Sequence, residues 1–511
     1  MLRFQIYTGG RQADKLDISQ AYLTRADGEP VRGRLKFAEG LLFFENTIDV
    51  PLALNLPWTI ENFGRTILAT SCLPDREEPY CLVTELVRGH LARMWSQKDS
   101  WGYAFRGPTE DFTKGFSKAK VDLAHCLTLS DNPAAASRLA GDVLTDIVPL
   151  GEKLAMEHAR SGFSWREKNG QLMQINYGCY LNPAGTDDVT RQRFAETFNY
   201  ATLPFVWRQI EPREHEHSWM WLDGWVHWLE AKGLTIKGGP MMMFTEEFLP
   251  DWLWIWENDF DTLRQYIADH IVRCVERYRG KIDHWDALSG LHLLNCMKFS
   301  LSQIMELTRT AARSVKQANP RATVVLDLVH PWGEYCATNP RSIWPLTYAE
   351  MCTNSDVDFD CIGLEIFMGA QGYHTRDLMN VSALLDQFDT LDKPVHITAV
   401  GVPSESTPDP DAGIPTGTGL QGGTWRRPWD EKTQSEWVDA FYRIAIGKPY
   451  VTAITWRDYS DYAGHFLPHA GLLRKNMTPK PALQKVMDLQ RKIWPTNAVE
   501  TPPDDFDWPD L

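Results

Sequence analysis

The hydrophobic pattern of the first 115 residues is typical of short strands separated by Gly, Pro and Asp. Apolar residues fill every second position over residues 50–58, and the runs at 33–44 and 65–70 are also of β type. The pattern predicts a β-rich, sandwich-like N-terminal domain over residues 1–115.

Helical spacing begins before that region ends. Apolar residues stand three and four apart over residues 82–95, and a second helical stretch runs from about residue 132 to 160. We therefore expect a helical connector over residues 116–170. The N-terminal region carries no catalytic motif, so we favour a role in bracing the following domain over a role in sugar binding.

From about residue 171 short apolar strands alternate with longer amphipathic helices, which indicates a parallel sheet. The strand candidates lie at residues 174–177, 200–203, 235–238, 284–288, 323–328, 361–366, 396–400 and 453–456. Eight such repeats predict an α/β fold, a (β/α)8 TIM barrel over residues 171–495. The Pro- and Asp-rich tail at 496–511 is expected to be loosely ordered.

The charge balance narrows the range of partners. With 52 Lys and Arg against 67 Asp and Glu, the formal net charge is −15, which excludes nucleic acid as an expected partner. The 21 Trp residues are densest between residues 207 and 285. An indole face suits stacking on a sugar ring, although we expect most of these residues to pack in the core. A carbohydrate is the expected partner, and the sequence leaves the oligomeric state open.

Neither a membrane nor a cofactor is expected. No apolar run reaches the roughly 18 residues that a spanning helix needs, and the first ten residues lack the pattern of a secretion signal. The nine Cys are scattered, and neither they nor the His residues have metal-ligand spacing. Reduced, buried thiols predict a cytoplasmic protein, with a secreted mature form as the alternative.

Four segments of the expected barrel carry a family likeness. They are residues 198–212, which hold Trp207 and a Glu-Pro pair, residues 225–252, which end in Leu-Pro-Asp-Trp, residues 277–286, and residues 454–482. Together, over about residues 174–492, they resemble the family-10 glycoside hydrolases, the xylanase family. The resemblance implies a barrel that holds a sugar chain and hydrolyses it with two Glu and no cofactor.

The departures from that family concern the two Glu. The resemblance implies Trp-Asp-x-x-Asn-Glu at the fourth strand and Ile-Thr-Glu in the seventh, but this chain has Gly290 and Ala399 there. The resemblance also implies a His and a Lys near the scissile sugar. Both are missing here, and Pro240 and Val206 occupy the nearest positions. Because neither Gly nor Ala can transfer a proton or form a glycosyl ester, the family mechanism cannot operate at these positions.

Carboxylates at other strand ends are candidates for that chemistry, because active groups of this fold gather there. Glu365 ends the apolar sixth strand, where desolvation would raise its pKa and suit a general acid; pairing with a barrel cation is the equal alternative. The loop after strand five places His330, Trp332 and Glu334 in one turn. It is interpreted as a sugar-binding loop with His330 or Glu334 as base, or as a solvated loop.

Strands six and eight supply further candidates. The resemblance implies that Trp456 floors a sugar subsite, and nearby Asp458 is a third candidate catalytic residue or half of a structural Arg–Asp pair. His374 and Arg376 indicate an acidic or sulfated sugar, or a structural contact between Arg376 and Asp377.

A glycine-rich insertion follows strand seven. It lacks the Gly-Lys-Ser/Thr of a phosphate loop, so we interpret it as a flexible lid that carries Trp425 and Trp429 to the cleft mouth, or as an irregular surface loop. Trp207, at a position where the resembled family has a Trp, completes the expected substrate-binding set.

Three functions remain at this point. The favoured one is a glycoside hydrolase that acts on a poly- or oligosaccharide with relocated catalytic carboxylates, because polar and aromatic residues cluster at the strand ends. The alternative is a catalytically inactive carbohydrate-binding pseudoenzyme, which fits the loss of both Glu. A scaffold that uses the barrel only for stability is the least favoured, and fold analogy alone cannot decide between them.

Overall fold

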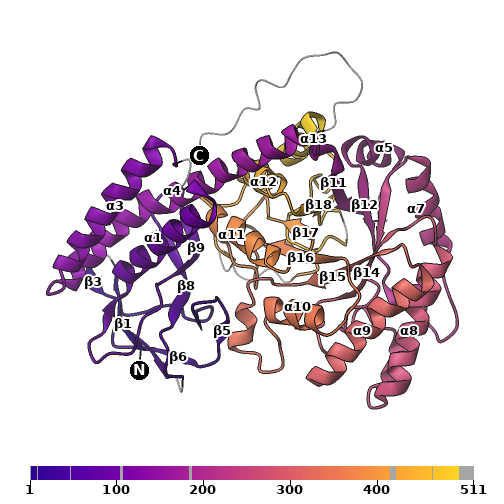
Figure 1. Ribbon diagram of the computed structural model, residues 1–511, viewed down its shortest axis with the longest axis horizontal. Helices are drawn as coiled ribbons and strands as arrows, with labels where there is room; N and C mark the ends of the chain where they lie inside the picture. The colour runs from indigo at the N-terminus through magenta and orange to yellow at the C-terminus, as the bar shows by residue number, and fades with distance from the viewer. Residues whose placement is uncertain are drawn as a thin grey trace.

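The computed structural model describes residues 2–8, 10–45, 48–103, 107–182, 187–414, 422–462 and 464–493. The expected tail at 496–511 lies outside the described residues, as does much of the expected lid, at 415–421. Figure 1 shows two parts side by side, an N-terminal part of sheets and long helices and a barrel.

The N-terminal part contains two four-stranded sheets, in the orders β10-β1-β7-β6 and β5-β4-β8-β9, and a two-stranded hairpin, β2-β3. The strands are β1 (Leu2–Gln5), β2 (Tyr7–Thr8), β3 (Arg11–Gln12), β4 (Tyr22–Thr24), β5 (Pro30–Val31), β6 (Arg34–Ala38), β7 (Leu41–Glu45), β8 (Ala53–Ile60), β9 (Gly64–Ala69) and β10 (Tyr80–Cys81). Three long helices follow: α1 (Leu82–Ser100), α3 (Glu110–Thr128) and α4 (Pro133–Lys168). The first 115 residues therefore include helix α1 as well as the expected strands.

The second part is the expected barrel, closed in the order β11 to β18 with all neighbours parallel. Its strands are β11 (Asn176–Tyr180), β12 (Tyr200–Leu203), β13 (Thr235–Gly238), β14 (His284–Ser289), β15 (Thr323–Leu328), β16 (Cys361–Phe367), β17 (Val395–Gly401) and β18 (Val451–Trp456). The eight-strand prediction is confirmed, because the period of strand and helix in the sequence was regular. Only the first strand starts later than expected, since residues 172–174 form the short helix η1 (Leu172–Gln174).

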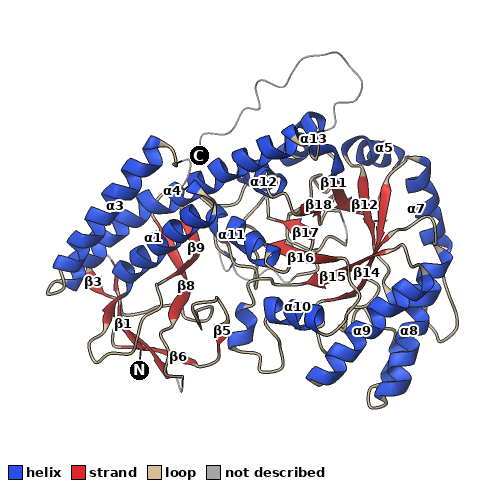
Figure 2. Cartoon of the chain, in the orientation of Figure 1, coloured by secondary structure: helices blue, strands red, loops and turns tan. Residues whose placement is uncertain are grey.

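Helices surround the barrel strands (Figure 2). They are α5 (Asp188–Thr197), α6 (Trp207–Ile210), α7 (Met220–Ala231), η2 (Asp251–Trp256), α8 (Phe260–Arg277), α9 (Leu301–Ala318), η3 (Glu334–Ala337), α10 (Pro345–Asn354), α11 (Leu378–Asp389), α12 (Glu431–Ile446) and α13 (Pro481–Ile493). None of the described helices is long and apolar enough to cross a membrane.

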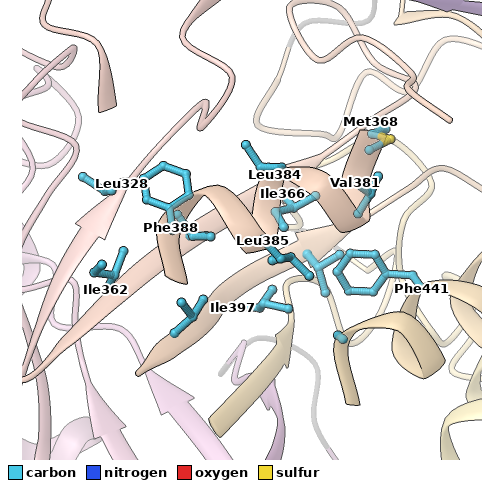
Figure 3. Close-up of a cluster of buried hydrophobic side chains, with 14 of the residues drawn as sticks. Leu328, Ile362, Ile366, Met368, Val381, Leu384, Leu385, Phe388, Ile397 and Phe441 are labelled. Carbon is cyan, nitrogen blue, oxygen red and sulfur yellow. The ribbon is translucent and has the colours of Figure 1, made fainter. Parts of the chain in front are cut away.

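Strand β16 shows how the alternation of side chains positions the site. Ile362 and Ile366 point outward and pack with Leu385 of α11 in the main core (Figure 3). Because successive side chains of a strand face opposite sides, Glu365 between them points into the barrel. The single acidic residue of this apolar strand thus stands on its inward-facing side, and its carboxyl group lies in the barrel interior.

The two parts are hydrogen-bonded through the edge of an N-terminal sheet. The Ile67 amide of β9 donates to the Thr375 carbonyl at 2.9 Å, and the Thr424 amide donates to the Arg65 carbonyl at 2.9 Å. Loops that follow β16 and β17 therefore extend the sheet that ends with β9. This pairing places the N-terminal part beside the C-terminal ends of the barrel strands.

Helix α4 also holds the two parts together, running across the top of the view in Figure 1 to reach α12. Gly162 permits this contact, because a Cβ atom there would lie 1.8 Å from the carbonyl oxygen of Gly447. No heavy atom lies within 4 Å of a Cβ atom built at Gly141, on the same helix.

The two glycines of α4 give a matched pair of substitutions. Gly162→Ala should destabilise the protein by about 1–3 kcal/mol, because the backbones must separate. Gly141→Ala should stabilise it by about 0.5–1 kcal/mol, because Ala loses less conformational freedom in a helix. Denaturant unfolding of both variants checks this, and equal effects would refute the close-packing argument.

Candidate active site

Acidic and basic side chains meet inside the C-terminal half of the barrel. Lys237 lies in β13, Asp286 in β14, Asp327 in β15 and Glu365 in β16. Each stands in an otherwise largely apolar run, and alternation turns it toward the barrel axis. The Nζ atom of Lys237 lies 3.8 Å from Oδ2 of Asp286, and both side chains are buried.

Asp327 is the centre of a hydrogen-bonded set. Its Oδ2 accepts a hydrogen bond from the Ser289 hydroxyl at 2.6 Å, and its Oδ1 accepts one from Thr398. Burial, and then the negative charge of Asp327, raise the pKa of Asp286 well above its usual value. The surroundings of Asp286 therefore favour the neutral form of its carboxyl group.

Glu365 lies at the end of β16 and is partly exposed. Burial raises its pKa to about 8, and the charge of Asp327 adds to that rise, while Arg457 and Lys237 oppose it. The guanidinium of Arg457 lies 4.0 Å from the ring centre of Tyr180 and 5.1 Å from that of Phe466. At neutral pH Glu365 therefore holds a proton near Arg457, which is partly exposed like Phe466, whereas Tyr180 is buried.

The loop after β15 brings a second carboxyl group to this end of the barrel. Glu334 follows Gly333, whose φ of 72° is left-handed, and its Oε1 lies 3.3 Å from Nη2 of Arg376. Burial alone would raise the pKa of Glu334, but the positive charges of Arg376, His330 and His374 lower it below its usual value. Glu334 is therefore ionised at neutral pH.

A pair of stacked rings connects the loop that carries Glu334 with the loop after β16. The rings of His330 and Tyr373 stack with centres 4.3 Å apart. The charges of both Glu365 and Glu334 act on the hydroxyl group of Tyr373. The two expected carboxyl groups therefore flank one aromatic pair and carry different protonation states.

Arg376 and Trp332 contact each other, and they are hydrogen-bonded to the N-terminal part and to helix α11. The Arg376 guanidinium lies 4.6 Å from the Trp332 ring centre and donates to the Tyr22 hydroxyl at 3.3 Å. The Trp332 indole donates to Asn380 at 2.8 Å. His374 is buried. Contacts within the protein occupy the faces of Trp332 and Arg376 that were expected to bind a sugar at the cleft.

The structure gives Asp458 and Trp456 structural positions. The carboxyl oxygens of Asp458 accept backbone hydrogen bonds from Phe466 at 2.7 Å and Leu467 at 2.9 Å, which closes the loop after β18. Trp456 has no exposed surface and donates to the Ala470 carbonyl at 3.0 Å. Because the Trp456 side chain packs in the core, it presents no open face to a sugar in this structure, and its role as the floor of a subsite stays a prediction.

Three more of the expected Trp platforms, Trp207, Trp425 and Trp429, are also buried, so they present no open face in this structure. Trp207 stacks on His270, with ring centres 4.3 Å apart, and its indole donates to Glu211 at 2.9 Å. Trp425 donates to Glu152 at 2.7 Å, and Trp429 donates to the Gly423 carbonyl at 3.0 Å. A large apolar side chain near a strand end gains more from burial than from exposure, and the sequence does not reveal which occurs.

Gly290 and Ala399 are both tightly packed. Gly290 has a φ of 65°, and a Cβ atom there would lie 2.9 Å from Leu294. Ala399 is buried in a cluster with Phe367, Leu467 and Ala470. A longer side chain at either position would strain the backbone or displace packed groups.

Several residues of the site were not expected from the sequence. They are Lys237, Asp286, Asp327, Tyr373 and Arg457. The available signal was a single charged residue inside an apolar strand, which is costly to bury unless it is paired or functional. Among the described residues, no group of three or more His, Cys, Asp or Glu could hold a metal ion.

Comparison with curated proteins identifies xylanases as relatives of part of the chain. An endo-1,4-beta-xylanase 3 from Hypocrea jecorina is 26% identical over 170 residues, which is 32% of this chain and 43% of that protein. An endo-1,4-beta-xylanase B from Humicola insolens is 25% identical over 116 residues, 23% of this chain and 31% of that protein. The matches thus span less than half the length of either relative.

Solved structures of xylanases match part of the chain. The native xylanase 10B from Thermotoga maritima matches with a TM-score of 0.48 and 20% identity, covering 63% of this chain and 97% of that one. The family model for glycosyl hydrolase family 10 matches residues 173–489, the whole span of the barrel strands. By this match over more than half of its length, the chain belongs to glycosyl hydrolase family 10.

Proposed function

We propose that this protein hydrolyses O-glycosyl bonds of a poly- or oligosaccharide with Glu365 as proton donor and Glu334 as the second carboxyl group. The observation that carries the proposal is the contrast in surroundings: Glu334 lies 3.3 Å from Arg376, which lowers its pKa, whereas burial and the charge of Asp327 raise the pKa of Glu365 to about 8. Glycosidases of both stereochemical classes need one protonated and one ionised carboxyl group. Environments that separate two pKa values in this way indicate the acid and the base.

The proposed reaction follows from these protonation states. Glu365 donates its proton to the glycosidic oxygen as the bond to the anomeric carbon breaks. Ionised Glu334 stabilises the positive charge that develops on the sugar or accepts a proton from the attacking water. Tyr373 and Phe466, both partly exposed, offer rings for sugar contact beside Glu365.

In this proposal the two Glu of the family pattern are replaced, by Gly290 and Ala399, and the catalytic carboxyl groups are relocated. The packing at both positions supports it. A Cβ atom at Gly290 already meets neighbouring side chains, and Ala399 is 1% exposed among apolar groups. Catalytic carboxyl groups at those places would require different surroundings.

The same packing favours a second candidate function, a catalytically inactive carbohydrate-binding protein. Apolar side chains around Ala399, including Phe367 and Leu467, fill the region beside β17. If Glu334 serves only as the ion-pair partner of Arg376, one proton donor remains without a second group, and sugar binding without turnover would result.

An assay for new reducing ends separates the two functions. We expect the protein to release reducing ends from at least one member of a panel of neutral, acidic and sulfated polysaccharides. Glu334→Gln should lower that rate strongly, whereas Asp458→Asn should change mainly thermal stability. Binding without cleavage across the panel would support the inactive alternative, and full activity in Glu334→Gln would remove that residue from the mechanism.

A further inference from the structure

A large cavity lies between the N-terminal part and the barrel, separate from Glu365. Its volume is about 660 Å³, within the range of about 300–1,000 Å³ typical of ligand sites. Strands β4, β8 and β9 and helix α1 form one wall, while Trp332, Trp344 and helix α11 form the other. Residues 25–27 at its edge are exposed, so the cavity opens to solvent there.

Of the three arginines that line this cavity, Arg93 and Arg376 are held by contacts with the protein. Arg93 of α1 donates to the Ala69 carbonyl at 2.8 Å and to the Thr70 carbonyl at 3.4 Å. Arg376 is 1% exposed, and its Nε atom makes no hydrogen bond to any part of the chain that the structure describes. An unsatisfied buried donor in a cavity wall is costly unless a ligand or water accepts its hydrogen bond.

The charges of the lining balance. Three cationic and three acidic residues contribute to it: Arg25, Arg93, Arg376, Asp27, Asp377 and Asp386. Protein groups engage Asp386, which accepts hydrogen bonds from the Lys448 ammonium at 2.8 Å and the Trp101 indole at 2.7 Å. An anionic or cationic ligand would find no excess of opposite charge, so the lining suits a neutral one.

The remaining lining combines hydroxyl and amide groups with two indoles. The polar groups include Thr24, Asn55, Ser96, Gln97, Ser100 and Gln387. Hydroxyls and amides can both donate and accept, which matches the hydroxyl groups of a sugar. The Trp344 side chain adds an apolar surface of the kind that contacts pyranose rings, and Trp332, which carries the Arg376 guanidinium over its ring, adds further apolar lining.

From this lining we infer that the cavity is a second binding site, for a short neutral oligosaccharide, formed jointly by the N-terminal part and the barrel. Neither Glu365, Asp286 nor Asp327 lines it, so the inference does not rest on the proposed catalytic roles. The N-terminal part then contributes to saccharide binding in addition to its contacts with the barrel loops.

The proposed experiment blocks the cavity with larger side chains introduced at its exposed edge. Ala92 and Ser96 of α1 are exposed lining residues, so a larger side chain there extends into the cavity without displacing core groups. Ala124, exposed on α3 and not part of the lining, provides the matched control. Ala92→Trp, Ser96→Trp and Ala124→Trp are compared in a Glu365→Gln background, so that hydrolysis does not consume the probe.

Titration calorimetry with xylotriose and with cellotriose measures binding to the full chain. We expect Ala124→Trp to bind one more trisaccharide per chain than Ala92→Trp or Ser96→Trp does, or to bind it at least tenfold more tightly. The melting temperatures of all three variants should be the same. Equal binding by all three variants would overturn the inference, as would preference for a uronic-acid trisaccharide over both neutral ones. Calorimetry of the cavity variants tests the second binding site, whereas the reducing-end assay tests Glu334 and Glu365. Either proposal can therefore fail without affecting the test of the other.

Discussion

Glu365→Gln should lower kcat/KM for saccharide hydrolysis by a factor of about 10²–10⁴, the usual contribution of a positioned general acid. Gln keeps the shape of Glu and can donate a hydrogen bond, but it cannot release a proton to the leaving oxygen. Reducing-end assays on the substrate that the panel identifies would measure the loss. Glu350→Gln, at an exposed position of α10, is the control and should keep wild-type activity.

The pH dependence provides an independent reading of the same residue. Because the pKa of Glu365 is raised to about 8, its acid form predominates at pH 7. Activity that depends on that proton should be constant below the pKa and fall about tenfold per pH unit above about 8. A profile that falls already above pH 5, or an unchanged alkaline limb in Glu365→Gln, would contradict the role of Glu365 as acid.

Stability gives a second readout for Glu365. Its pKa is higher in the folded chain than the usual 4.5, so the folded state binds more protons between about pH 4.5 and 8. This contribution to stability is present below pH 4.5 and is lost as pH rises through about 8. Glu365→Gln removes that loss, so its melting temperature should exceed the wild-type value at pH 9 more than at pH 4.

Glu152→Ala should destabilise the protein by about 3–5 kcal/mol, the range for breaking a buried charge pair. Glu152 of α4 has no exposed surface, and its Oε2 accepts a hydrogen bond from Nη2 of Arg426 at 2.7 Å. Its Oε1 accepts from the Trp425 indole at 2.7 Å and from the Leu378 amide at 3.0 Å. One side chain of the N-terminal part thus accepts hydrogen bonds from three residues of the barrel, Leu378, Trp425 and Arg426.

The measurement is denaturant unfolding together with limited proteolysis. Without Glu152, the Arg426 guanidinium and the first amide of α11 lose their acceptor, so the loop that carries Trp425 should be cut faster. Glu167→Ala, at an exposed position of α4, should change stability by less than about 0.5 kcal/mol. Similar unfolding of the two variants would show that the buried set does not join the two parts.

Local pattern was sufficient for the architecture of the barrel. In β15 and β16 every second side chain packs outward, and the regular return of such strands predicted eight parallel strands. Glu365 could also be chosen as a candidate site residue from the sequence. A carboxyl group within an apolar strand cannot face the apolar outer core, so it is expected to face the barrel interior. Its role in catalysis stays a prediction.

Partners that are distant in sequence could not be predicted. The hydrogen bond from the Trp425 indole to Glu152 joins residues 273 positions apart in the sequence. The hydrogen bond from Arg376 to Tyr22 joins residues 354 positions apart. The glycine-rich sequence before Trp425 indicated an exposed lid. In the structure the Trp425 indole is buried, because it donates a hydrogen bond to Glu152 of α4. For the same reason, Trp332 and Arg376 line an interdomain cavity instead of the expected cleft.

The sequence by itself determined the barrel, the family likeness, and the place of a carboxyl group at the end of β16, because these depend on the order and alternation of neighbouring residues. Only the tertiary structure decided which indoles are buried, how Glu334 is held ionised by Arg376, and that the two parts enclose a polar cavity. Those properties depend on contacts between residues far apart in the chain, where burial and charge are set by the neighbours that folding brings together.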